Sequence, residues 1–425
     1  MRERAFEGSR VGVINLGCAR NLVDSQIILG RLKQNGHRVV DVKTADIAII
    51  NTCSFIEEAK KESIDTILDL IELKKKGRIK KIIVAGCLAQ RYGTQLAQEF
   101  KEVDAIVGTL ALEKEGIPTQ VPLTPAHFAY VKICESCFNQ CSFCVIPKIK
   151  GKFSSRTIES VVDEVKALDE KGVKEINIIG QDITAYGMDI YREKSLARLL
   201  KSLLPVLKNI EWVRLLYAFP AHVTDELIEV MASDSKICRY IDIPLQHISD
   251  DILKSMRRGI TKEGTIELIQ KFREKIPSAS LRTTFIVGLP GETDKHFAEL
   301  LDFVRTARFE RVGVFVYSRE EGTAAYDFPH QVPAPIKKQR LDVLMQEQKV
   351  ISQELQRRFL DKRLKVLIEE KIKNQPGFYL GRSEYDAPEV DGVIYVHSSR
   401  PLKAGDFVQA AISDTLEYDL IAEAL

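Results

Sequence analysis

Short apolar runs alternate with amphipathic helical stretches along most of the 425-residue chain, and this alternation restricts the possible folds more than any other feature. Strands joined by helices form a parallel sheet with helices packed on its faces. Five apolar runs at the start of the chain are expected to be such strands: residues 11–16, 38–42, 47–51, 81–86 and 103–108. We therefore predict that residues 1–120 form a doubly wound parallel α/β domain.

The next segment repeats the strand–helix unit six times. Its expected strands are residues 129–134, 176–180, 212–218, 239–245, 281–288 and 311–318, and helical patterns fill the gaps between them. Consecutive units of this kind are typical of a partial (β/α) barrel. We predict this (β/α)6 barrel for residues 121–355, beginning near a connector at 116–127 that contains three prolines.

The last segment, residues 356–425, consists of short strand-like runs separated by Gly, Pro and Asp turns, which predicts a small β-barrel. The whole chain has a formal net charge of +2 and no apolar run near the roughly 18 residues of a membrane span. We expect a soluble, cytoplasmic protein with no membrane partner. In that compartment, clustered cysteines bind metal or do redox chemistry more often than they form disulfides.

Four of the eight cysteines lie between residues 134 and 144, and three of them are spaced C-x3-C-x2-C: Cys137, Cys141 and Cys144. They follow the first barrel strand, at the end of the strands where active sites of such barrels lie. Three thiolates can hold three irons of a four-iron cluster and leave the fourth iron open. If S-adenosylmethionine binds that iron, one electron can cleave its sulfonium and release a 5′-deoxyadenosyl radical. This spacing is the motif of the radical SAM superfamily.

Two simpler interpretations of the same loop compete with this one. With Cys134 included, the pattern is C-x2-C-x3-C-x2-C, but structural zinc sites usually separate their cysteine pairs by about 12 residues or more. A bacterial ferredoxin has a different spacing, and a pure electron-transfer module does not account for six strand–helix units. Cys134 falls within the expected strand, so we interpret it as a small buried residue.

A second set of three cysteines follows strands of the first segment. Cys18, Cys53 and Cys87 each come within about three residues of a strand end, and doubly wound sheets bind ligands outside the carboxyl ends of their strands. Parallel strands bring all three thiols to one edge of the sheet. We predict a second cluster with an open iron at this edge, and we interpret the remaining Cys238 as a packing residue.

Taken together, these features resemble the radical SAM methylthiotransferases from about residue 10 to the end of the chain. The resemblance implies a C-terminal TRAM domain, two [4Fe-4S] clusters, and S-adenosylmethionine as both radical source and methyl donor. It also implies that one cluster makes the radical while the other supplies or delivers sulfur. An external electron donor of the flavodoxin or ferredoxin type is expected.

Within the family, the chain is most similar to enzymes that methylthiolate the β-carbon of an aspartate in small-subunit ribosomal protein twelve. The stretches that carry this similarity are LGCARNLVDSQ (16–26), GQDITAYG (180–187), TTFIVGLPGET (283–293), RVGVFVYSREEGTAAYDFPHQVP (311–333) and GRSEYDAPEVDGVIYV (381–396). The alternative is a transfer RNA adenosine methylthiotransferase, a type that has Asn in place of Asp182. Departures from the expected pattern fall at Ala19, Arg20, Gln26, Cys134, Ser136 and Gly180, none of which is a predicted ligand.

Polar residues near the strand ends are candidates for contact with S-adenosylmethionine. The residues that we predict for this role are Gln181, Arg214, Gln246 and Gly288. A group of cations follows the cluster loop, where each is either a solvated surface charge or a contact to substrate or cofactor: Lys148, Lys150, Lys152 and Arg156.

The charge of the last segment bears on the choice of substrate. Residues 356–425 contain ten Lys and Arg against twelve Asp and Glu, whereas a barrel that grips a phosphate backbone should carry a basic excess. An acidic balance favours a basic ribosomal protein as the partner, and RNA contact is not favoured. We expect the stretch EYDAPEVDG (384–392) to form the acidic docking face.

Overall fold

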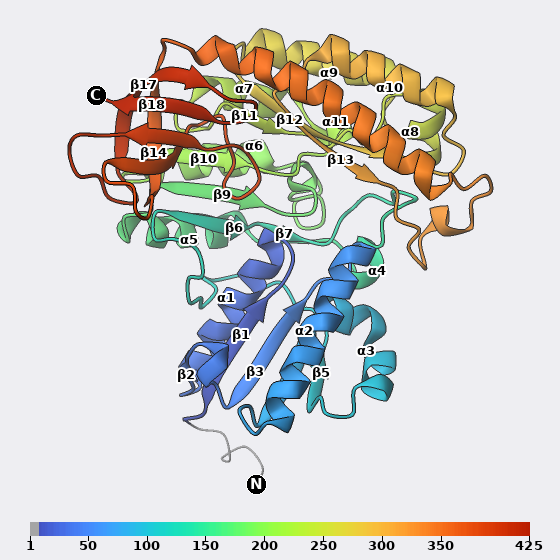
Figure 1. The fold of residues 1–425 in the computed structure, drawn as a ribbon, viewed down its shortest axis with the longest axis vertical. Coiled ribbons are helices and arrows are strands. Elements are labelled where there is room, and N and C mark those ends of the chain that lie inside the picture. The colour runs from blue at the N-terminus through green and yellow to red at the C-terminus, as the bar shows by residue number, and fades with distance from the viewer. Residues whose placement is uncertain (1–7) are drawn as a thin grey trace.

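The structure is a computed structural model, and it describes residues 8–425. Figure 1 shows three parts: an N-terminal α/β domain at the bottom, a central layer of strands backed by helices, and a C-terminal barrel at the upper left. Within the described residues, no helix combines the length and the apolar character needed to cross a membrane.

The N-terminal domain is the predicted doubly wound sheet. Its strands are all parallel and lie in the order β2-β1-β3-β4-β5. They are β1 (Arg10–Asn15), β2 (Arg38–Val39), β3 (Ile47–Thr52), β4 (Lys81–Gly86) and β5 (Ala105–Val107), connected in part by helices α1 (Ala19–Gln34), α2 (Glu57–Lys75) and α3 (Cys87–Glu99). The order reverses between β1 and β3, and such sheets bind ligands at the carboxyl ends of the strands beside this reversal.

The central domain contains the six predicted strands in two parallel sheets, β10-β9-β6 and β11-β12-β13. A bridge between Val213 and Ile237 links the two sheets, so the strands form one open barrel. The strands are β6 (Phe128–Lys132), β9 (Glu175–Ile179), β10 (Trp212–Leu215), β11 (Tyr240–Asp242), β12 (Ser280–Val287) and β13 (Arg311–Val316).

Helices cover the outer face of this barrel and form the largest buried core with it. They are α5 (Ile158–Glu170), α6 (Leu196–Leu203), α7 (Asp225–Ser233), α9 (Lys262–Lys275), α10 (Asp294–Ala307) and α11 (Ala334–Gln356). The cluster loop lies between β7 (Cys134–Glu135), which follows β6, and the short helix α4 (Ile146–Lys150).

The C-terminal segment is the predicted small barrel, closed in the order β14-β15-β16-β18-β17. Its strands are β14 (Arg363–Lys371), β15 (Phe378–Arg382), β16 (Ile394–His397), β17 (Phe407–Thr415) and β18 (Leu420–Ala424). Closure leaves no free sheet edge, and alternate side chains of these strands form a core of their own.

A shared apolar cluster joins all three domains on the inner face of the open barrel. Its buried members come from α1, from β6, β9, β10 and β11 with the residues next to them, and from the C-terminal barrel: Val23, Ile27, Phe128, Tyr130, Ile179, Trp212, Leu216, Cys238, Tyr240, Leu367 and Ala387. The ring of Trp212 meets that of Phe407 at 4.8 Å between centroids. Helix α1 and the C-terminal barrel therefore close the inner side of the barrel by burying apolar surface.

Buried ion pairs accompany this apolar contact. Glu175 on β9 accepts hydrogen bonds from Nε of Arg214 (2.8 Å) and Nη2 of Arg382 (2.7 Å). None of the three side chains is more than 3% exposed. A buried charge is tolerated only when it is paired, so Glu175 holds a central-domain arginine and a C-terminal arginine together.

The acidic stretch 384–392 does not form the docking face that the sequence predicted. Asp386 is buried against Arg311 at 2.5 Å, and Asp391 accepts a hydrogen bond from the hydroxyl of Tyr240 at 2.6 Å. Both carboxylates bind the central domain, so this acidic stretch serves the contact between two domains of the same chain.

We expect Glu175→Gln to lower the free energy of unfolding by about 3 kcal/mol, because it removes the charge that Arg214 and Arg382 share. The matched control is Glu193→Gln, whose carboxylate is 62% exposed beside Arg198 and should contribute less than about 1 kcal/mol. Urea unfolding followed by circular dichroism measures both changes. Equal losses in the two variants would contradict the role assigned to Glu175.

Candidate active site

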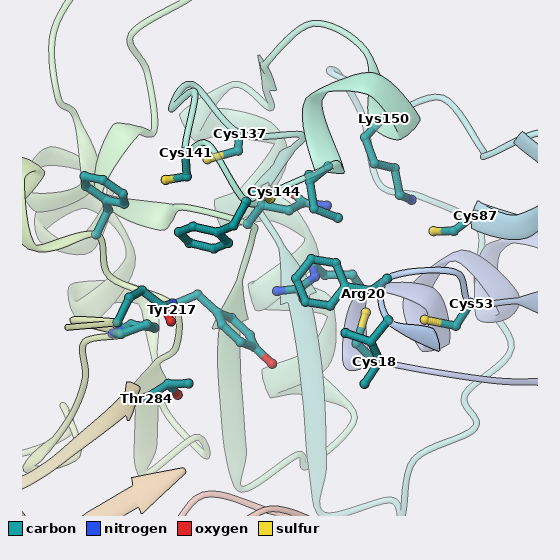
Figure 2. A pocket seen from close by; sticks show the side chains of 18 of the residues that line it. Cys18, Arg20, Cys53, Cys87, Cys137, Cys141, Cys144, Lys150, Tyr217 and Thr284 are labelled. Atoms are coloured by element: carbon teal, nitrogen blue, oxygen red, sulfur yellow. The ribbon is translucent and has the colours of Figure 1, made fainter. Parts of the chain in front are cut away.

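One cavity of about 390 Å³ lies between the N-terminal domain and the carboxyl ends of the barrel strands, and all six predicted ligand cysteines line it. Figure 2 shows Cys137, Cys141 and Cys144 on one side and Cys18, Cys53 and Cys87 on the other. The sequence predicted two sites at the strand ends of two domains. The structure places these two ends face to face around a common space.

Two glycines turn the chain from strand ends into helices that begin with a cysteine. Gly17 and Gly86 both have a φ of +93°, in the left-handed region that favours glycine. A Cβ on Gly17 would also lie 2.8 Å from the Cβ of Cys53. Cys18 is the N-cap of α1, and Cys87 is the first residue of α3. The positive end of a helix dipole stabilises a thiolate at both positions.

The three N-terminal thiols differ in acidity. Burial raises the pKa of Cys87 to about 12, and it also raises the pKa of Cys53. Burial opposes ionisation of Cys18 too, but the Arg20 guanidinium and the backbone N–H groups of Asn21 and Arg20 outweigh it and lower the pKa. A thiolate therefore forms most readily at Cys18, while a metal must displace a proton from the other two thiols.

Hydrogen-bond donors already surround the thiols of the central loop. Backbone N and Nδ2 of Asn139 each lie 3.4 Å from Sγ of Cys137, and Nη1 of Arg258 lies 3.4 Å from Sγ of Cys141. Burial raises the pKa of Cys137 to about 11 and that of Cys144 to about 12. Donors of this kind stabilise the thiolates once a metal replaces the protons, and they tune the potential of an iron–sulfur cluster.

The donor set fits iron–sulfur clusters better than zinc. In residues 8–425, no three His, Cys, Asp or Glu side chains are placed to hold a single metal ion. A four-iron cluster binds each thiolate through a different iron, so three cysteines leave one iron open. Cys134, which a four-cysteine zinc site would need, is fully buried and lies 3.6 Å from the backbone oxygen of Asp182. Cys238 is likewise buried, in the cluster that joins the domains, and the burial of both thiols agrees with their interpretation as packing residues.

Two of the four residues predicted to contact S-adenosylmethionine line the cavity. Gln181 and Gln246 each have a buried Oε1 with no hydrogen-bond partner in the described part of the chain. Gln246 and the cavity residue Tyr217 have left-handed φ values of +74° and +70°, a strained geometry that is frequent at functional sites. Contact with the cofactor stays a prediction for both glutamines.

Arg214 and Gly288 lie outside the cavity, so the structure does not support the roles predicted for them. Arg214 is the third of the four residues of β10, and its buried guanidinium donates to Glu175 and to the backbone oxygen of Glu384 in the C-terminal barrel. Gly288 is packed against the side chain of Lys337. The sequence correctly placed the strands, but it did not show which positions along them the other elements cover.

The sequence analysis missed the role of the charges that join the two sides of the cavity. Lys132 contacts both Asp24 and Glu135, while Nζ of Lys150 lies 3.0 Å from Oδ2 of Asp24 and 3.4 Å from Oε1 of Glu135. All four side chains are buried. Lys150 was one of the cations expected near the mouth, but no spacing rule connects it with Asp24 on α1.

The other cations expected near the mouth fall into two groups. Arg156 is buried and pairs with Glu164, and its Nη2 donates to the backbone oxygen of Ser160 at 3.0 Å. Lys148 and Lys152 are exposed. Arg156 is therefore part of the barrel wall, and the two exposed lysines fit the interpretation as solvated charges.

Three family models match the chain in sequence order. The Uncharacterized protein family UPF0004 matches residues 10–108, the Radical SAM superfamily matches residues 131–304, and the TRAM domain matches residues 362–425. The matches correspond to the N-terminal sheet, the open barrel and the closed C-terminal barrel.

Known proteins similar to this chain over nearly its full length are ribosomal protein uS12 methylthiotransferases RimO. The one from Desulforamulus reducens is 46% identical, with 97% of this chain and 99% of the relative covered. Those from Clostridioides difficile and Geobacter sulfurreducens are 43% and 44% identical over 98% of this chain.

Among solved structures, the chain is similar to TsrM from Kitasatospora setae, a radical S-adenosylmethionine methyltransferase bound to its tryptophan substrate and a SAM analog. The TM-score is 0.51 at 15% identity, covering 72% of this chain and 73% of that chain. At this identity the likeness concerns the fold alone.

Two of the departures noted in the sequence, Cys134 and Gly180, contact each other. A Cβ on Gly180 would lie 2.4 Å from Sγ of Cys134. We expect Gly180→Ala to destabilise the protein by roughly 1–3 kcal/mol through overpacking, and Cys134→Ala in the same chain to restore most of that loss. Thermal unfolding of the single and double variants measures the coupling. Additive effects of the two changes would contradict a direct contact.

Proposed function

The chain belongs to the RimO family of ribosomal protein uS12 methylthiotransferases, and from this membership we propose that it adds a methylthio group to the β-carbon of an aspartate in uS12. The reaction joins a carbon–hydrogen activation to a sulfur transfer. The observation that carries the proposal is the single cavity lined by both sets of cysteines, because it lets both halves of the reaction act on one substrate atom.

The residues around the cavity suit radical chemistry. An iron–sulfur cluster bound at Cys137, Cys141 and Cys144 supplies, with S-adenosylmethionine, a radical able to remove a hydrogen atom from an unreactive carbon. Apolar side chains form much of the wall: Phe55, Ile56, Phe143, Phe219 and Pro244. Such a lining excludes water and protects a reactive substrate from side reactions.

We further propose that Cys18, Cys53 and Cys87 hold a second [4Fe-4S] cluster, which delivers the sulfur. The cations Arg20 and Lys150 support this assignment, because both lower the pKa of Cys18 and both line the cavity. An electron donor of the flavodoxin or ferredoxin type supplies the reducing electron, and the enzyme works in the cytoplasm. In this scheme residues 1–120 carry sulfur, 121–355 generate the radical and 356–425 complete the fold.

A transfer RNA adenosine is the alternative substrate, and no specific observation in the structure favours it. The acidic balance of residues 356–425 no longer separates the two substrates, because Asp386 and Asp391 are used inside the protein. The choice of uS12 is supported instead by the full-length similarity to enzymes named for that substrate.

The substrate proposal is tested by mass spectrometry after reaction of the reconstituted enzyme with S-adenosylmethionine and a reductant. We expect uS12 to gain one methylthio group on an aspartate, and we expect transfer RNA from the same cells to stay unmodified by the enzyme. Methylthiolated adenosine together with unchanged uS12 would assign the chain to the alternative.

The two-cluster proposal is tested by iron analysis under anaerobic conditions. We expect about eight irons and eight sulfides per wild-type chain, since each set of three thiols supports one four-iron cluster. Changing Cys137, Cys141 and Cys144 to Ala should remove half of the iron and abolish cleavage of S-adenosylmethionine. Changing Cys18, Cys53 and Cys87 to Ala should remove the other half but leave cleavage intact. Complete loss of iron in either variant would show that the two sites do not assemble independently.

A further inference from the structure

Three cationic side chains line the cavity, and two of them are already paired. Lys150 is held by Asp24 and Glu135 at 3.0 and 3.4 Å. Arg258 donates from Nη1 to Sγ of Cys141 at 3.4 Å and from Nη2 to the backbone oxygen of Pro244, while its guanidinium lies 4.0 Å from the centroid of Phe219. Arg258 is therefore held at the loop that carries Cys141, and Lys150 is held at the contact between the N-terminal and central domains.

Arg20 is the third cation, and its geometry is different. It extends from the first turn of α1 toward the barrel, where Nη1 donates to the backbone oxygen of Gly180 at 3.0 Å. The guanidinium also lies close enough to the Cys18 thiol that its charge lowers the pKa of that thiol. An arginine has five N–H donors, so these contacts leave donors for a ligand. Lys150 has two carboxylate partners, whereas Arg20, like Arg258, has no ion pair with an Asp or Glu carboxylate among residues 8–425.

Tyr217 fixes the position of this guanidinium. The Arg20 guanidinium carbon lies 4.3 Å from the centroid of the Tyr217 ring, in a cation–π contact. The strained backbone of Tyr217, with φ at +70°, holds that ring at the end of β10. Figure 2 shows Arg20 between the two sets of cysteines, beside Tyr217. The guanidinium is thus held between the cysteines proposed to serve radical formation and those proposed to serve sulfur delivery.

We propose that Arg20 binds the side-chain carboxylate of the substrate aspartate; this inference rests on the proposed function. A carboxylate entering an apolar cavity needs a charged, hydrogen-bonding partner, because burial of an unpaired charge is costly. A guanidinium can hold a carboxylate through two parallel hydrogen bonds, which fixes its orientation as well as its position. The β-carbon is bonded directly to that carboxylate, so this anchor places the reacting carbon between the two sets of cysteines.

The test is a double-mutant cycle across the complex, measured as the Kd of the reconstituted enzyme with S-adenosylmethionine bound. The enzyme variant is Arg20→Met, and the substrate variant is uS12 with its target aspartate changed to Asn. We expect Arg20→Met to weaken binding of natural uS12 by roughly 30-fold, and to weaken binding of the Asn form by less than about 3-fold. Equal weakening of both forms would overturn the proposal.

Arg91→Met is the matched control. Arg91 also joins the N-terminal and central domains, through Glu320 at 2.8 Å, but it does not line the cavity. We expect this variant to bind both forms of uS12 like the wild type. If it reproduces the selective loss seen with Arg20→Met, the effect comes from domain contact and the proposal is wrong.

Two further measurements separate other roles of Arg20. The S-adenosylmethionine concentration for half-maximal cleavage should be unchanged in Arg20→Met, because cleavage depends on the other set of cysteines; a shift in that concentration with unchanged uS12 binding would assign the guanidinium to the cofactor instead. If Arg20→Met loses iron, Arg20→Lys replaces it in the same double-mutant cycle. Lysine keeps the positive charge but lacks the planar guanidinium that can make two parallel hydrogen bonds. It should bind natural uS12 about 5-fold more weakly and the Asn form nearly normally. Wild-type enzyme that binds neither form would refute the proposed function rather than this role.

Discussion

Four charges buried between the N-terminal and central domains fix the geometry on which the site depends. Asp24 and Glu135 face Lys132 and Lys150 in a neutral set, and no side chain in it is more than 6% exposed. Burial favours the neutral form of Glu135, but the two lysines outweigh it and lower its pKa to about 2. Loss of any one member would leave a buried charge without a partner, so the set holds only one arrangement of the two domains.

These charges are placed close to both sets of cysteines along the chain. Asp24 lies on α1, the helix that begins after Cys18, while Lys150 ends α4, the helix that follows Cys144. A slip of one domain against the other would therefore break ion pairs and change the cavity at the same time. The C-terminal barrel uses the same principle through Glu175, and it closes the side of the open barrel opposite the helices. Two carboxylates of its acidic stretch, Asp386 and Asp391, bind the central domain in that contact.

The sequence predicted the strands and helices, and it singled out the six cysteines that line the cavity, because both follow rules of short range. Strand ends in parallel sheets point to Cys18, Cys53 and Cys87, and the spacing within one loop points to Cys137 and its neighbours. Arg214 could not be judged in this way, because the C-terminal barrel that covers it lies far along the chain. The sequence marked Arg20 only as a departure from the expected pattern, because Tyr217 and Gly180 contact it only in the folded protein.

The two sets of cysteines open into one cavity, so that two clusters bound there would act on the same substrate atom. Electron paramagnetic resonance of the anaerobically reduced enzyme measures whether the two clusters lie close together. We expect a magnetic interaction between the two reduced clusters that disappears when either set of three cysteines is changed to Ala. Two independent signals in the wild-type enzyme, each unchanged by removal of the other cluster, would contradict the shared site.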